Sequence, residues 1–139
     1  VNDDGNNLFT GQEDGDIQIW GLPSFSIIVE LKAHPKLVTS LMCFGQYLAS
    51  GSYYDKYVYV WDLQEQKQIA IVNCRGPINN IFMNNRNQMM INSDEGIFVQ
   101  SVNLTDMRCY STVPRLKNLT SDYIYFYQGQ IAVLLFKTN

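Results

Sequence analysis

Apolar and polar residues alternate along short stretches of the chain, and turn-forming residues separate these stretches. Residues 14–20 and 55–61 each run from an Asp to a Trp, with apolar side chains at every second position. Alternation with a period of two is typical of β-strands, and no stretch keeps the periodicity of a helix. Strands of roughly four to seven residues recur at about ten-residue spacing. The pattern therefore predicts an all-β protein.

The strand pattern repeats with a period near 40 residues, which is a sign of a repeat architecture. Segments 14–20, 55–61 and 94–100 each begin with Asp; the first two end with Trp, whereas the third ends with Gln. Counting strands predicts three in the first unit, four in the second, four in the third and two in the fourth. Within 1–139 we therefore expect a partial repeat at 1–32, a full repeat at 33–73, a degenerate repeat at 74–113 and a partial repeat at 114–139.

A four-stranded sheet cannot cover both of its own faces, so neighbouring repeats must pack against each other. Radial packing of such sheets makes a β-propeller, which closes with four to eight blades. A chain of 139 residues holds about three and a half such repeats. We expect an incomplete propeller, an open arc of blades that missing sequence or another copy of the chain completes.

The second repeat resembles the WD40-repeat family. Its motifs are Ala33-His34 in place of the family's Gly-His, Leu-Ala-Ser-Gly-Ser at 48–52, Asp55, and the intact Trp61-Asp62. The resemblance implies a propeller that binds protein partners through its faces. It also implies a buried chain of hydrogen bonds in each blade, linking Trp, Ser or Thr, His and Asp. Carried over, these residues are Trp61, Ser50, His34 and Asp55 in the second repeat, and Thr10, Asp14 and Trp20 in the first.

The third repeat departs from the family pattern. Arg75-Gly76-Pro77 stand where the His is expected, and Gln100 stands where the Trp is expected. We therefore expect no such network in this repeat. The second repeat also has one extra residue, Tyr53 or Tyr54, in the turn before Asp55.

The His, Asp and Ser of the second repeat could in principle form a nucleophilic site, with His34 and Asp55 activating Ser50. Their spacing matches the internal network of the repeat, and no oxyanion-type glycine motif accompanies them. We therefore expect a structural role and no enzyme activity. The three cysteines form no C-x-x-C pair and His34 is the only histidine, so no metal site and no cofactor are predicted.

The family resemblance also indicates where partners bind. In this family the residue before the turn Asp, and the residue before the first strand of a repeat, tend to project onto the partner-binding face. Tyr is a typical interface anchor because its ring is rigid and its tip is polar. The candidate partner-binding residues are Glu13, Leu37, Tyr53, Tyr54 and Ser93.

Charge and composition narrow the function further. A net charge of -3 does not indicate a positively charged surface that would bind a phosphate backbone, so we do not expect this segment to bind nucleic acid. No apolar run is long enough to span a membrane, and no signal peptide precedes the first strand. The cysteines indicate reduced thiols, hence the cytoplasm or nucleus.

An interaction scaffold is thus the predicted function. The alternatives are an RNA-associated WD-repeat protein, since residues 22–25 loosely resemble plant CCCH zinc-finger WD-repeat proteins, and the substrate receptor of a ubiquitin ligase, as in F-box WD-repeat proteins.

Overall fold

The structure, a computed structural model, describes residues 1–2, 4–74, 76–83, 88–94, 96–102, 109–111, 123–127 and 130–134. Arg75 lies outside the described residues, and of the predicted fourth repeat at 114–139 only two strands are described. The described part is built of strands and turns without a helix, so the all-β prediction is confirmed. None of the described residues belongs to a helix that could cross a membrane.

The described strands form four antiparallel sheets of three, four, four and two strands, the numbers that the repeat pattern predicts. Blade 1 contains β1 (Asn7–Gly11), β2 (Asp16–Gly21) and β3 (Ser26–Lys32). Blade 2 contains β4 (Ser40–Phe44), β5 (Tyr47–Gly51), β6 (Tyr57–Asp62) and β7 (Lys67–Asn73). Blade 3 contains β8 (Ile78–Met83), β9 (Gln88–Ser93), β10 (Gly96–Val102) and β11 (Cys109–Ser111), and the last pair is β12 (Tyr123–Tyr127) with β13 (Gln130–Leu134).

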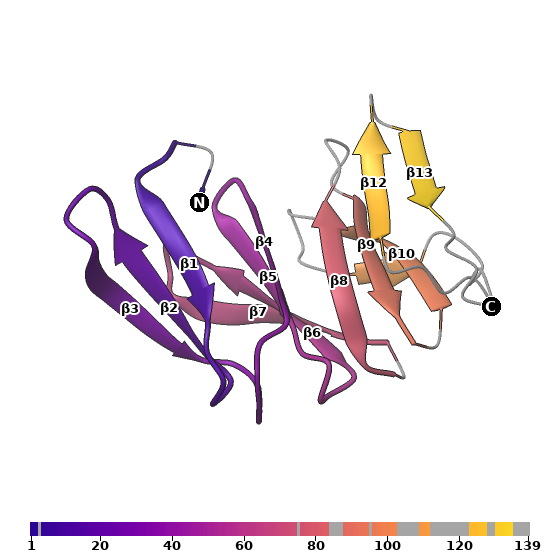
Figure 1. The fold of residues 1–139 in the computed structure, drawn as a ribbon, viewed down its shortest axis with the longest axis horizontal. Helices are drawn as coiled ribbons and strands as arrows, with labels where there is room; N and C mark the ends of the chain where they lie inside the picture. Colours follow the sequence, from indigo (N-terminus) through magenta and orange to yellow (C-terminus); the bar gives the residue numbers. More distant parts are fainter. Residues whose placement is uncertain are drawn as a thin grey trace.

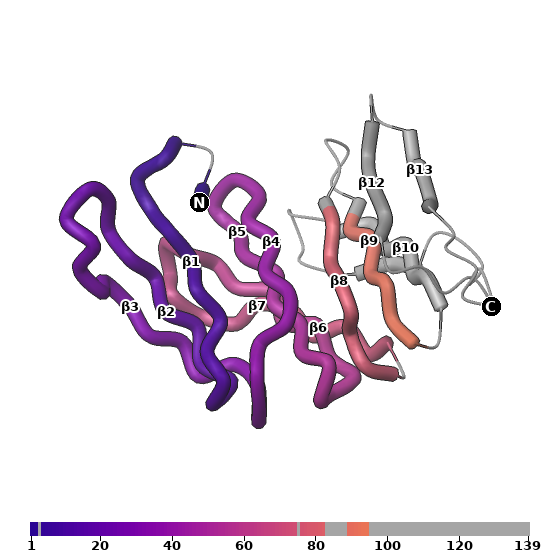
Figure 2. The backbone as a smooth tube through the Cα atoms, in the orientation of Figure 1, coloured from indigo at the N-terminus to yellow at the C-terminus, as the bar shows by residue number. Residues whose placement is uncertain are grey.

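Each strand pairs with the next one along the chain, so every blade is a meander. Figure 1 shows blade 1, blade 2 and the first strands of blade 3 following one another from left to right. The smooth trace of Figure 2 shows the same order, from indigo through magenta to orange. Contacts of β4 with β1 and with β8 join the three blades. The blades thus form an arc in sequence order.

Blades 1 and 2 repeat each other in detail. The ladder between the second-last and last strands shifts register at Ile19/Trp20 in blade 1 and at Val60/Trp61 in blade 2. These bulges lie at the two Trp residues that mark the sequence repeat. A bulge re-aims the side chain beside it, so both indole rings are placed in the same way within their sheets.

Apolar clusters fill the spaces between blades. Period-two alternation places Val58 and Val60 on the side of blade 3, and Tyr59 and Trp61 on the side of blade 1. The cluster between blades 1 and 2 has Ile17, Ile19, Leu31, Val38, Leu48 and Trp61 at its centre. The cluster between blades 2 and 3 contains Ala49, Val58, Val60, Val72, Cys74, Ile78, Ile81, Met89 and Ile91.

A glycine at the end of one strand allows the next blade to approach closely. A Cβ on Gly11 would lie 2.6 Å from Val38 Cβ, and a Cβ on Gly51 would lie 2.6 Å from Ile78 Cγ2. Real Cβ atoms do not come so close, so glycine is needed at both positions. The two glycines hold equivalent places, each against the first residues of the following blade.

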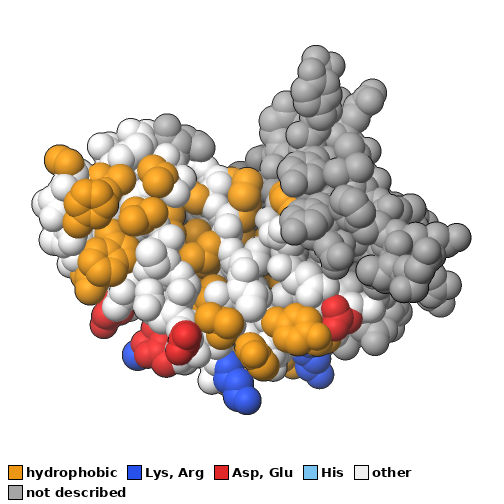
Figure 3. All heavy atoms as spheres, viewed as in Figure 1, with side chains coloured by type: hydrophobic (Ala, Val, Ile, Leu, Met, Phe, Trp, Pro, Cys, Tyr) orange, Lys and Arg blue, Asp and Glu red, His pale blue; other side chains and the backbone are white. Residues whose placement is uncertain are grey.

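One face of blade 1 lacks the cover that the matching face of blade 2 receives. Leu48 and Trp61 are buried against blade 1, whereas their counterparts Leu8 and Trp20 are only half-buried. Phe25, also on blade 1, is exposed. Figure 3 shows hydrophobic side chains gathered over this side of the molecule, at the left of the view. This face of blade 1 thus carries the side chains that form a contact between blades in blade 2, but no described blade packs against it.

Candidate functional site

The chemistry-bearing residues of the sequence gather at one edge of the blades, which we name the turn edge. It consists of the turns 12–16 and 52–57 and the connection 33–39, which runs from blade 1 to blade 2. In Figure 1 these segments lie along the lower border of the first two blades. Residues far apart in sequence therefore share one surface.

Four residues of blade 2 form a continuous chain of hydrogen bonds behind the turn edge. His34 Nδ1 lies 2.7 Å from Asp55 Oδ2, and His34 Nε2 lies 3.0 Å from Ser50 Oγ. Trp61 Nε1 donates to the same Ser50 hydroxyl at 3.0 Å. If Nδ1 carries the proton, His34 donates to the carboxylate and accepts from Ser50, whose oxygen accepts from the indole; this tautomer is inferred from the bonding pattern. Every polar group then has a partner.

The network is shielded from solvent. The His34 side chain has 0% exposure, and its ring centroid lies 4.7 Å from that of Tyr59. Burial raises the pKa of the Tyr59 hydroxyl, with a smaller contribution from Asp55, so this neighbour stays neutral. The carboxylate also accepts a hydrogen bond from the backbone N–H of Tyr57 at 2.8 Å, which ties the network to the turn. Its evident effect is to fix the turn 52–57 and the connection 33–39.

Blade 1 holds a shorter version of this network. Trp20 Nε1 donates to Thr10 Oγ1 at 2.8 Å, as the indole does in blade 2. Asp14 accepts from the backbone N–H of Asp16 at 3.2 Å, which matches the role of Asp55 in its turn. Gln12 Nε2 donates to Thr10 Oγ1 at 2.9 Å and takes the place of a histidine. The sequence pattern missed Gln12 because no family motif marks that position.

Cys74 follows β7 directly and leads from blade 2 toward blade 3. The backbone N–H of His34 bonds to Gly15 O at 2.9 Å, and that of Cys74 bonds to Lys56 O at 2.8 Å in the same way. The expectation that Arg75-Gly76-Pro77 stand in place of the histidine stays a prediction, because Arg75 lies outside the described residues. Cys74 has 0% exposure and belongs to the apolar cluster between blades 2 and 3.

Three of the predicted partner-binding residues line one shallow pocket at the turn edge. Glu13 comes from the first turn, Leu37 from the connection and Tyr54 from the second turn; with Lys36 they surround a volume of about 350 Å³. Tyr54 is 57% exposed, and Tyr53 packs edge-on against it with 5.8 Å between ring centroids. The sequence did not single out Lys36, whose Nζ lies 5.4 Å from the Tyr54 ring centroid.

The prediction that Ser93, the remaining candidate partner-binding residue, projects onto the partner-binding face is wrong. Ser93 has 0% exposure, because it is still part of β9 and pairs with Ile78 and Gly96. Two residues separate β9 from β10, whereas five separate β5 from β6, so Ser93 still lies in its strand while Tyr54 lies in a turn. Ser93 is therefore enclosed where Tyr54 is exposed.

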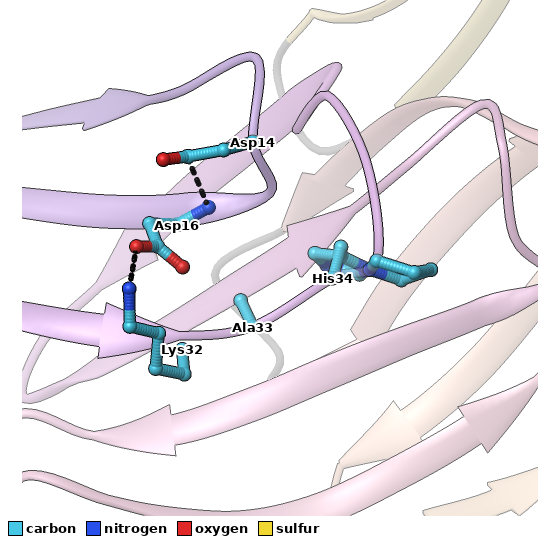
Figure 4. Close-up of a pocket in the computed structure, with 6 residues that line it drawn as sticks. Asp14, Asp16, Lys32, Ala33 and His34 are labelled. Atoms are coloured by element: carbon cyan, nitrogen blue, oxygen red, sulfur yellow. Dashed lines mark hydrogen bonds and ion pairs between the residues drawn. The ribbon is translucent and has the colours of Figure 1, made fainter.

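A second pocket, of about 410 Å³, opens between the turn of blade 1 and the connection (Figure 4). Asp16 forms an ion pair with Lys32 at its wall, and Asp14 accepts the backbone hydrogen bond of its own turn. The charges that it presents are thus paired within the protein. The lining residues are Asp14, Asp16, Lys32, Ala33, His34 and Pro35. The described side chains include no group of three or more His, Cys, Asp or Glu that could hold a metal ion.

The Asp of the Trp-Asp motif acts at the opposite edge of blade 2. Asp62 Oδ1 accepts from the backbone N–H groups of Gln64 and Glu65 at 2.9 and 3.0 Å, and Gln46 Nε2 donates to Oδ2 at 3.1 Å. These bonds, the one from Glu65 above all, lower the pKa of the Asp62 carboxyl against its cost of burial. Asp62 therefore stabilises the turn between β6 and β7.

The family model of the WD domain, G-beta repeat, matches residues 25–62, which contain the complete hydrogen-bond chain of blade 2. The matched residues are similar to a WD40 repeat, and they cover one of the repeats of this chain. No curated protein matches its sequence. WD40 propellers generally act as protein-interaction scaffolds and are generally not catalysts.

Three solved structures share the fold. The β-propeller domain of Cps50 (Swd1) from Myceliophteria thermophila is 28% identical, with a TM-score of 0.70 over 79% of this chain and 36% of that one. A chain of the mitotic checkpoint complex is 18% identical, with a TM-score of 0.72 over 87% of this chain and 39% of that one. The computationally designed Ika8 protein is 18% identical, with a TM-score of 0.71 over 88% and 38%. The chain thus spans little more than a third of the length of each of these chains, and the prediction of an incomplete propeller is confirmed.

Proposed function

We propose that this chain is an interaction scaffold that binds protein partners at its turn edge and performs no chemistry of its own. The observation that carries the proposal is the pocket shared by Glu13, Leu37 and Tyr54, which come from three separate segments. Tyr is enriched among the residues that contribute most of the binding energy at protein interfaces, and Tyr54 is 57% exposed here.

Rigidity of the surrounding backbone supports the same function. The Ser52 hydroxyl donates to Leu37 O at 2.7 Å and accepts from the backbone N–H of Tyr54 at 3.1 Å. The backbone N–H of Val38 bonds to Gln12 O at 3.1 Å. These bonds join all three segments that line the pocket. A surface fixed before binding loses less conformational entropy when a partner docks.

The buried state of the hydrogen-bond chain argues against catalysis by its members. Ser50 has 0% exposure, and its hydroxyl is engaged by both His34 and Trp61. A nucleophile must reach its substrate, and a general base must lie within hydrogen-bond distance of the proton that it takes. His34 lies within hydrogen-bond distance of the Ser50 hydroxyl, but a serine enclosed between blades cannot reach a substrate.

The uncovered face of blade 1 implies further partners of a different kind. Leu8, Trp20 and Thr10 match the fully covered Leu48, Trp61 and Ser50 of blade 2. We infer that another blade covers this face, supplied either by sequence beyond the chain or by a second copy. The turn-edge pocket lies between blades 1 and 2, so it does not depend on which of the two supplies the cover.

A capture experiment tests the proposed function. The wild-type chain and a Tyr54→Ala variant serve as baits in matched pull-downs with quantitative mass spectrometry. Loss of an aromatic hot spot costs about 2 kcal/mol or more, so specific partners should fall by at least about tenfold. Ile71→Ala is the control, because Ile71 is an exposed apolar side chain (55%) of β7 that does not line the pocket. Partners that ignore Tyr54→Ala, or that depend on Ile71 instead, would contradict the proposal.

A further inference from the structure

Ser52 directly follows β5 and joins its own turn to two other segments of the chain. Its backbone carbonyl accepts from the backbone N–H of Ile78, the first residue of β8, at 3.1 Å. Its hydroxyl donates to Leu37 O at 2.7 Å and accepts from the backbone N–H of Tyr54 at 3.1 Å. A hydroxyl has only one proton to donate, so the bond to Leu37 fixes the direction of this group. Ser52 has 0% exposure, so a partner cannot contact it directly.

The two residues that bond to this hydroxyl both line the turn-edge pocket of about 350 Å³. Leu37 belongs to the connection 33–39, whereas Tyr54 belongs to the turn 52–57. The Lys36 ammonium, one residue before Leu37, lies 5.4 Å from the Tyr54 ring centroid, so the two segments approach closely here. One buried hydroxyl therefore holds two segments of the pocket wall at a fixed separation.

Another hydrogen bond joins the same two segments, but through residues that do not line this pocket. His34 bonds to Asp55 at 2.7 Å as part of the buried chain of blade 2, which continues to Ser50 and Trp61. Removal of the Ser52 hydroxyl breaks none of these bonds. The stability of the blade and the geometry of the pocket therefore depend largely on different side chains.

Blade 1 uses the matching residue, Gln12, in a different way. The Gln12 carbonyl accepts from the backbone N–H of Val38 at 3.1 Å, as the Ser52 carbonyl accepts from Ile78. The Gln12 side chain, however, turns back into its own blade and donates to Thr10 Oγ1 at 2.9 Å. The carbonyl contact is thus a repeated feature of the blades, whereas the two hydroxyl bonds of Ser52 have no counterpart at Gln12.

We propose that Ser52 is a positioning residue of the turn-edge pocket, which contacts no partner itself but holds Leu37 and Tyr54 at the separation that a partner recognises. Its hydroxyl bonds to the peptide groups of both residues, so loss of the hydroxyl releases both parts of the wall. A wall that must be ordered when the partner docks adds an entropic cost to binding. The inference rests on the proposed function and names a residue on which that function depends.

Ser52→Ala tests this role with two measurements on the full chain. Nuclear magnetic resonance follows hydrogen exchange of the Tyr54 amide and the contact between the Lys36 side chain and the Tyr54 ring. In Ser52→Ala the amide should exchange about two- to tenfold faster, and the ring contact should weaken. Quantitative capture then follows the partners that Tyr54→Ala loses, and their recovery on Ser52→Ala should fall about two- to tenfold.

Thr39→Val is the matched control. Thr39 Oγ1 donates to Ile78 O at 3.1 Å, so it also joins the connection 33–39 to blade 3, but it bonds to no residue that lines the pocket. This variant should leave the Tyr54 amide, the ring contact and the captured partners unchanged. Circular dichroism of each variant checks that it is folded. If Ser52→Ala does not fold, Ser52→Cys takes its place, because it fills the enclosed site and offers only a weak donor.

The outcomes separate the positioning role from the scaffold function. An unchanged exchange rate and ring contact in Ser52→Ala would show that the hydroxyl does not fix the wall. A loosened wall with unchanged capture would show that binding does not need the wall to be fixed. Equal losses in Thr39→Val would assign the effect to the contact with blade 3 in general. Each of these three results overturns the role of Ser52 and leaves the scaffold function standing, whereas absence of any partner that depends on Tyr54 would overturn both.

Discussion

Replacing His34 by Ala should destabilise the chain strongly, because it breaks the hydrogen-bond chain of blade 2 at its centre. The imidazole has 0% exposure and is bonded to both Asp55 and Ser50. Water cannot readily replace it in a space enclosed by neighbouring blades. The variant therefore loses two bonds and leaves the Asp55 carboxylate, only 10% exposed, without its principal partner.

The expected cost follows from the two contacts. The 2.7 Å bond to Asp55 involves a charged acceptor, and such bonds contribute about 1.5–3 kcal/mol. The 3.0 Å bond to Ser50 is neutral, and contributes about 0.5–1.5 kcal/mol. Together they give a loss of about 2–4.5 kcal/mol in the free energy of unfolding. Lost packing of the imidazole ring on Tyr59 adds to this value.

Urea denaturation, followed by both tryptophan fluorescence and far-ultraviolet circular dichroism, measures the loss. Coincident transitions from the two probes justify a single free energy, since blades of a repeat protein can unfold separately. A double-mutant cycle of His34→Ala with Asp55→Ala should give a coupling energy of about 1.5–3 kcal/mol.

Thr10→Ala is the internal control for this prediction. It removes the corresponding hydroxyl of blade 1, which accepts from Trp20 but is only half-buried. Water can replace that hydroxyl, so the expected cost is about 0.5–1.5 kcal/mol. If His34→Ala cost no more than Thr10→Ala, or if the His34 and Asp55 substitutions were simply additive, the buried network would not stabilise the blade as the geometry indicates.

Three further predictions concern glycine, pH and the open face. Gly15→Ala should destabilise the chain more than Gly51→Ala, because Gly15 has φ +94° and a Cβ there would meet a backbone carbonyl oxygen, whereas a Cβ on Gly51 would meet a side chain. Thermal unfolding of both variants checks this order, and the reverse order would contradict the prediction. Hydrogen bonds lower the pKa of the Asp62 carboxyl below 3.8, so the stability that Asp62 contributes is present above that value and is lost as the pH falls through the folded-state pKa. Asp62→Asn should therefore reduce the loss of stability at acid pH, and an unchanged loss would contradict this prediction. Leu48→Ala should lower the free energy of unfolding by about 2–5 kcal/mol, and Leu8→Ala should lower it clearly less in the isolated chain, because Leu8 is only half-buried. Equal losses in chemical denaturation would contradict the inference that this face of blade 1 is uncovered.

Much of the fold and of the hydrogen-bond chain could be predicted from the sequence. Spacing alone paired Trp61 with Trp20 and Asp55 with Asp14, and the strand ladders place these pairs equivalently. Such features are local, since a strand and its turn are encoded by residues next to one another.

Positions that depend on loop length could not be predicted in this way. Ser93 is buried because the turn of blade 3 is short, so one more residue stays in the strand. Gln12 and Lys36 were missed because nothing in the repeat pattern marks them.

The sequence by itself determined the all-β class and the repeat, and its resemblance to the WD40-repeat family indicated the residues of the buried hydrogen-bond chain. Period-two alternation and motif spacing depend on residues that are neighbours along the chain, so they can be recognised from the sequence alone. Only the tertiary structure brought Glu13, Leu37 and Tyr54 into one pocket with Lys36. It also decided that these side chains are near the surface while Ser93 is enclosed. The physical reason is that exposure and proximity depend on how far each blade approaches the next, which the close contacts at Gly11 and Gly51 fix.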